Sequence, residues 1–97
     1  MKEKATKDKI KEIVVPILKR HNVKRASLFG SIVRDDYTEG SDIDILVELQ
    51  EDTSLLDFIG IKLEIEDATN KKVDLVEYDM IKPALKEYIL SEQEVIL

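Results

Sequence analysis

Hydrophobic positions in the first half of the chain follow first a helical and then a strand-like spacing. A helical repeat predicts an amphipathic helix over residues 6–21, and Pro16 should kink it because proline cannot donate a backbone hydrogen bond. A strand is then predicted over residues 25–29 and a short helix over residues 31–36. After a turn at 38–41, a second strand is predicted over residues 42–49. The apolar positions of the first helix are Ile10, Ile13, Val14, Ile17 and Leu18.

The second half continues the alternation of helices and strands. Residues 51–54 should cap a helix over residues 55–69, which is dense in apolar residues but weakened by Gly60. A third strand is predicted over residues 72–76 and a last helix over residues 83–91, while residues 95–97 either add an edge strand or pack on the first helix. This order predicts an α/β (α+β) fold: one small domain over residues 1–97, with a short mixed sheet flanked by helices. The second strand should bury Ile43, Ile45, Val47 and Leu49.

Composition narrows the classes of partner. The chain has 97 residues, with 15 basic and 21 acidic residues and a net charge of −6. An acidic protein of this kind is poorly suited to bind long nucleic acids directly, although a single nucleotide or a basic protein remains compatible. The chain has no cysteine and no apolar stretch long enough to span a membrane, so we expect a cytoplasmic protein without membrane contact.

The most informative motif joins the first two predicted strands. Gly30 and Ser31 leave the first strand, and Asp42 and Asp44 begin the second. A turn of this type can offer backbone N–H groups and a hydroxyl to a phosphate. Aspartates two residues apart on a strand point to the same face, as two carboxylates that bind Mg²⁺ together require. The alternative is a polar, solvated strand face without chemistry.

Asp74 could complete this group. It lies between two apolar residues of the third predicted strand, so its side chain points away from theirs. If the second and third strands are neighbours, Asp74 converges on Asp42 and Asp44. Otherwise it is a solvated aspartate on an exposed strand.

Other residues near the motif have both a functional and a structural interpretation. Arg34 lies one helical turn after Ser31 and could bind a phosphate, or it could form a salt bridge with a nearby aspartate. Ser31 could equally cap the short helix. His21, the only histidine, is expected to be structural at a helix end, and Tyr37 is expected to be a packing residue although it lies in the motif loop.

At this point the chain resembles a minimal nucleotidyltransferase of the DNA polymerase β superfamily. The residues that carry the resemblance are Gly30, Ser31, Arg34, Ser41, Asp42, Asp44 and Asp74. The resemblance covers the whole chain, and it departs from the family pattern at Asp35, where many members have glycine. It implies that Asp42, Asp44 and Asp74 are catalytic and hold two Mg²⁺ ions. It also implies that Gly30, Ser31, Arg34 and Ser41 bind the nucleotide.

By the same resemblance, small members of this size are often the antitoxin of a HEPN/MNT toxin–antitoxin pair. The implied activity is protein adenylyltransfer, in which AMP from ATP is placed on a tyrosine of a basic, helical HEPN-domain ribonuclease with release of pyrophosphate. Two alternatives remain open at this stage. One is an antitoxin that neutralises its toxin by binding alone, and the other is an enzyme that transfers a nucleotide to a small molecule.

Overall fold

The computed structural model describes residues 6–34, 36–38 and 40–97, and its elements follow the predicted order. The helices are α1 (Thr6–Arg20), α2 (Ser31–Arg34), α3 (Leu55–Thr69) and α4 (Pro83–Glu92), with a short 3-10 helix η1 (Tyr78–Met80) before α4. The strands are β1 (Arg25–Phe29), β2 (Ile43–Glu48), β3 (Val73–Glu77) and β4 (Glu94–Val95). Helix η1 had not been predicted. The helix α1 runs continuously through Pro16.

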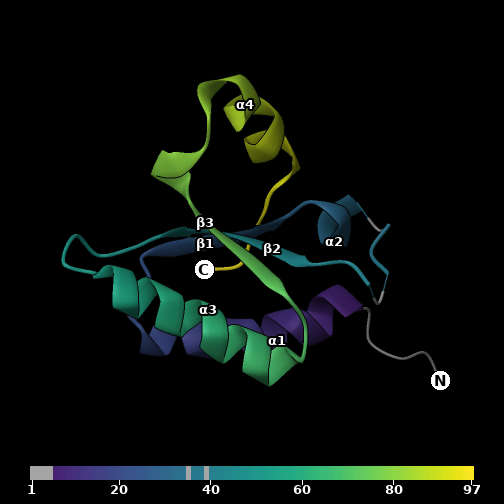
Figure 1. Ribbon diagram of the computed structural model, residues 1–97. Coiled ribbons are helices and arrows are strands. Elements are labelled where there is room, and N and C mark those ends of the chain that lie inside the picture. Colours follow the sequence, from purple (N-terminus) through teal and green to yellow (C-terminus); the bar gives the residue numbers. More distant parts are fainter. Residues whose placement is uncertain (1–5, 35, 39) are drawn as a thin grey trace.

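The strands form one mixed sheet in the order β3-β2-β1-β4. Strand β1 is antiparallel to both β2 and β4, whereas β2 and β3 are parallel. Helices α1 and α3 cover one face of the sheet, and η1 and α4 lie over the other (Figure 1). The predicted mixed sheet flanked by helices is therefore confirmed. Of the two alternatives for the end of the chain, an edge strand forms, but over Glu94–Val95, while Ile96 and Leu97 pack against the main core. Glu94 also forms salt bridges with Lys7 and Lys11 of α1.

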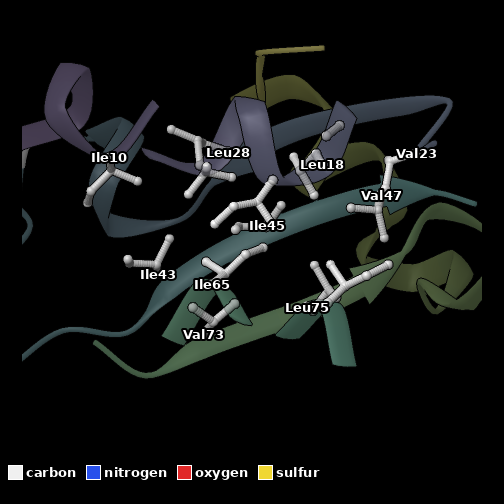
Figure 2. Close-up of a cluster of buried hydrophobic side chains, with 14 of the residues drawn as sticks. Ile10, Leu18, Val23, Leu28, Ile43, Ile45, Val47, Ile65, Val73 and Leu75 are labelled. Carbon is white, nitrogen blue, oxygen red and sulfur yellow. The ribbon is translucent and has the colours of Figure 1, made fainter. Parts of the chain in front are cut away.

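The main hydrophobic core lies between the sheet and the pair of helices α1 and α3. Figure 2 shows residues from α1, α3 and three strands converging in this core. As predicted, Ile43, Ile45 and Val47 are buried there, and Leu49 is partly buried. Alternation along β2 thus directs every second residue into this core.

A second, smaller core on the opposite face had not been predicted. It is built on Leu46 of β2 together with Tyr78 and Ile81, which follow β3. The Tyr78 hydroxyl hydrogen-bonds the buried Ser27 hydroxyl at 2.6 Å, and its ring lies 4.3 Å from the Arg25 guanidinium carbon. These contacts hold the segment that leads into α4 against the sheet.

Local signals explain where most helices end. Asn22 and Asn70 adopt the left-handed conformation after α1 and α3, with φ of 59° and 56°. Ser54 and Asp57 form a reciprocal capping box at the start of α3. Helix α2 was predicted to reach residue 36 but ends at Arg34, and an acidic residue such as Asp36 is unfavourable at the negative end of a helix dipole. In the part of the chain that the structure describes, no helix has the length and hydrophobicity needed to cross a bilayer.

Candidate active site

The turn from β1 into α2 brings the backbone of Gly30 directly against Asp44. Phe29 and Asp44 are opposite each other in the antiparallel pair, so Gly30 follows at the end of the ladder. Its φ is +78°, and a Cβ at this position would lie 2.3 Å from Oδ2 of Asp44. Only glycine fits both the conformation and the space. The predicted phosphate turn and the predicted metal-binding strand are therefore in contact.

Asp44 and Asp74 are direct partners in the parallel pair of β2 and β3. Partners in neighbouring strands are about 5 Å apart and point to the same face. The condition for Asp74 to approach Asp44, that the two strands are neighbours, is therefore met. Asp74 is solvent-exposed. Asp42 is exposed in the segment just before β2, rather than in the strand as predicted.

Electrostatics distinguish Asp44 from ordinary surface aspartates. Partial burial, followed by repulsion from Asp74 and Asp42, raises the pKa of Asp44 to about 6, although the nearby Arg34 opposes the change. Asp44 is half-buried in β2, next to the fully buried residues 45–47, whereas Asp42 and Asp74 are exposed. A cation bound at this end of the sheet would relieve the repulsion.

Arg34 is held at the rim of the site by two carboxylates. Its Nη1 donates to Glu92 of α4 at 3.1 Å and its Nε to Asp36 at 3.4 Å. The hydrogen bond with Glu92, followed by attraction to Asp36, raises the pKa of Arg34. The salt bridge to Asp36 matches the structural alternative, while the bond to Glu92 was not foreseen. Both bonds are exposed, so an incoming phosphate can compete with them.

The loop between α2 and β2 is closed by Ser41. Its hydroxyl accepts a hydrogen bond from the backbone N–H of Thr38 at 3.1 Å and lies 3.2 Å from the Thr38 hydroxyl. The Tyr37 hydroxyl is buried without a hydrogen-bond partner among the described residues, and burial, followed by Asp42, raises the Tyr37 pKa. The departure at Asp35 lies outside the described residues.

A cleft of about 490 Å³ opens beside these residues. Six of the seven predicted site residues line it, and Asp74 lies outside the lining. Helix α4 supplies a wall that the sequence did not predict, formed by Tyr88, Ile89 and Glu92. No local pattern marks these three residues, because their place depends on how α4 folds back over the sheet. The predicted lining residues are Gly30, Ser31, Arg34, Ser41, Asp42 and Asp44.

The donor set at this end of the sheet suits Mg²⁺. The carboxylates repel one another, and Gly30 leaves Oδ2 of Asp44 room that any side chain would fill. Within the described ranges, no three histidine, cysteine, aspartate or glutamate side chains are gathered closely enough to enclose a metal by themselves. Mg²⁺ commonly binds through one or two carboxylates and completes its shell with substrate phosphates and water. An open carboxylate site beside a phosphate turn fits that mode.

The mixed sheet, the glycine–serine turn and the paired aspartates define a nucleotidyltransferase domain. The family model described as "Polymerase beta, Nucleotidyltransferase" matches residues 9–97. The chain belongs to this family.

Two relatives of the chain are named as protein adenylyltransferases. One is a candidate protein adenylyltransferase of Methanocaldococcus jannaschii, 51% identical over 88% of this chain and 91% of the relative. The other is the protein adenylyltransferase MntA of Thermococcus cleftensis, 38% identical over 75% of this chain and 74% of the relative.

Solved structures agree on the architecture. A structure described as a candidate minimal nucleotidyltransferase has a TM-score of 0.79 and 34% identity, covering 90% of this chain and 89% of its own. An MNT antitoxin structure, from a complex with a tri-AMPylated HEPN toxin of Shewanella oneidensis, has a TM-score of 0.73. It covers 95% of this chain and 72% of its own at 17% identity, so this likeness concerns the fold alone.

Proposed function

We propose that this protein is a protein adenylyltransferase that moves AMP from ATP to a hydroxyl of a HEPN-domain toxin and thereby acts as its antitoxin. The observation that carries the proposal is the contact between the Gly30 turn and Asp44, with Asp74 beside Asp44 on the next strand. Phosphate-binding and metal-binding groups are adjacent there. The names of the two relatives support protein as the acceptor.

The turn and its neighbours would bind the triphosphate. Gly30 and Ser31 line the cleft, and so does Arg34, one helical turn further on. Once Arg34 leaves Glu92, its guanidinium can bind phosphate oxygens through two charge-assisted hydrogen bonds. Ser41 keeps the loop that carries Asp42 in place at the other side of the cleft.

Asp42, Asp44 and Asp74 would hold two Mg²⁺ ions, which would neutralise the triphosphate and make the acceptor hydroxyl more acidic. The acceptor oxygen would form a bond to the α-phosphorus while the bond from that phosphorus to the bridging oxygen of the β-phosphate breaks, so pyrophosphate leaves. Asp74, which is exposed on strand β3 next to Asp44, would take the hydroxyl proton. Positioning and charge neutralisation by these residues supply most of the acceleration.

The acceptor would be a tyrosine of the partner, as the family resemblance implies, and the acidic chain is compatible with a basic partner. We further propose that residues 1–97 work as one domain, because the four strands form a single sheet. The predicted cytoplasmic location also belongs to this proposal, because such a reaction consumes ATP.

The decisive experiment follows the mass of the partner. The chain, its HEPN-domain partner, ATP and Mg²⁺ are incubated together, and the partner is weighed by mass spectrometry for added AMP. Asp44→Asn should lose transfer by several orders of magnitude while still associating with the partner, and Asp8→Asn, which changes an exposed aspartate of α1 outside the cleft, should behave as wild type.

A partner that keeps its mass with the wild-type chain would refute the enzymatic proposal. If the complex then still forms and the toxin is silenced, neutralisation by binding alone becomes the better account. Transfer to a small hydroxyl compound, with no transfer to protein, would instead favour a small-molecule enzyme.

A further inference from the structure

Helix α3 is apolar on two opposite sides, although the chain covers only one. Ile61 and Ile65 are buried against the sheet. On the other side lies an exposed stripe, which we call the α3 stripe and which consists of Leu55, Leu56, Ile59 and Leu63. At 100° per residue these four positions fall within about 100° of one another and face away from the buried pair. A helix that is apolar all round is normally covered all round.

The exposure of the α3 stripe is large. Leu55 and Leu56 are 73% and 80% exposed, and Leu63 is 55% exposed. Single exposed leucines are ordinary on protein surfaces, but a contiguous stripe of them on one helix indicates an interaction site. Its well-formed capping box shows that the stripe is part of a regular helix, with the first turn fixed by Ser54 and Asp57.

A hollow adjoins the start of the stripe. It has a volume of about 440 Å³, and its walls come from the start of α3, the end of β3 and η1, including Leu55, Phe58 and Met80. Met80 is itself 72% exposed. Helix α3 lies on the outer side of the molecule (Figure 1), so the stripe and the hollow can be reached together. A partner could insert an apolar side chain into the hollow and lay others along the stripe.

Charge around the stripe identifies the kind of partner. Residues 51–67 contain six acidic residues and one lysine, Lys62, so this segment carries five of the six net negative charges of the chain. Glu51, Asp52 and Asp67 are exposed there. Two copies that met through α3 would bring these acidic segments together and repel. A partner with lysine and arginine around an apolar centre would instead be attracted.

We propose that the α3 stripe and its hollow are the docking surface for the basic HEPN-domain partner, separate from the catalytic cleft. The proposal rests on the proposed function for the identity of the partner. The cleft lies on the side of the sheet that α4 covers, whereas α3 covers the opposite side (Figure 1). Strand β3 is one of the two edge strands of the sheet and carries the exposed Asp74. A partner that grips α3 can therefore reach Asp74 around this edge.

The test compares three variants of the chain in a titration with the purified partner. Leu56→Gln with Leu63→Gln removes the centre of the stripe while keeping helix propensity, and should weaken binding at least about tenfold. Asp67→Lys should also weaken binding, yet leave stability unharmed because a lysine suits the last turn of a helix. Leu85→Gln replaces a leucine on α4 that is 50% exposed, and should bind as wild type.

Each outcome decides between the proposals. If all three variants bind the partner with wild-type affinity, the docking surface is wrong even when the wild-type chain transfers AMP. If the stripe variants lose binding while the wild-type chain binds but transfers no AMP, docking stands and the proposed function fails. Light scattering of the isolated chain provides a further check, since a wild-type dimer that the stripe variants abolish would assign α3 to self-association and overturn the proposal.

Discussion

Replacing Asp44 with asparagine should stabilise the metal-free protein at neutral pH while it abolishes catalysis. The pKa of Asp44 is raised from 3.8 to about 6, by partial burial first and then by Asp74 and Asp42. The folded state therefore binds this proton more tightly than the unfolded state does. The resulting stability is fully present below pH 4 and is lost as the pH rises through about 6. Asparagine has no charge to desolvate, so the variant avoids this loss.

The expected gain in stability of Asp44→Asn follows from the change in the pKa of Asp44. Two pKa units correspond to about 3 kcal/mol, and the partial exposure of Asp44 reduces this to about 1–2 kcal/mol. For a domain of this length that amounts to an increase in melting temperature of roughly 5–10 °C. The gain should disappear near pH 4, where wild-type Asp44 is protonated in the folded state.

Thermal and urea unfolding with a chelator present, at pH 4 and at pH 7.5, would measure the difference. Asp52→Asn is the matched control, because Asp52 is exposed in the turn before α3, and should change stability by less than about 0.5 kcal/mol at either pH. Equal stability of wild type and Asp44→Asn at pH 7.5, or a gain that persists unchanged at pH 4, would refute the electrostatic account. Mg²⁺ with ATP should then stabilise the wild type more than the variant.

Two further substitutions test the turn and the arginine. Gly30→Ala should cost about 2 kcal/mol in urea unfolding and remove transfer, because a Cβ would lie 2.3 Å from Asp44 Oδ2 at a φ of +78°; wild-type stability would show that the turn can relax. Glu92→Gln should tighten binding of a fluorescent ATP analogue, because it weakens the hold on Arg34. Unchanged or weaker binding would mean that Glu92 positions Arg34 instead of competing with phosphate.

Features that depend on neighbours in sequence could be predicted well. Hydrophobic spacing and turn signals located the helices α1 to α4 and the strands β1 to β3, with their ends within one or two residues, whereas β4 was one of two alternatives for the last residues and η1 was missed. The motif that contains Gly30 and Asp44 could be recognised in the sequence because only a short loop separates the glycine–serine turn from the aspartates of the second strand. Alternation in β3 then gave the direction of Asp74, and its contact with Asp44 needed only one assumption about strand order, which the parallel pairing confirms.

Features that depend on packing across the sheet could not be predicted. The burial of Leu46 requires that η1 and Ile81 cover the face opposite α3, and nothing in the pattern of β2 indicates this cover. The same cover brings Tyr88 and Glu92 of α4 to the cleft. The alternative for Arg34, a salt bridge with a nearby aspartate, is present with Asp36, but its bond to Glu92, 58 residues away in sequence, was not foreseen. Such contacts are set by tertiary structure, which local spacing does not encode.

Strand β2 explains why core and site depend on each other. Leu46 is fully buried under Tyr78 and Ile81, and Asp44 points to the same face two residues earlier, at the edge of that cover. Partial burial is the largest cause of the raised pKa of Asp44, and we expect the cover over Leu46 to contribute to that burial. A smaller residue at position 46 should admit water and lower the pKa of Asp44. The affinity of Asp44 for a cation would then depend in part on Leu46, which is not among the residues that line the cleft.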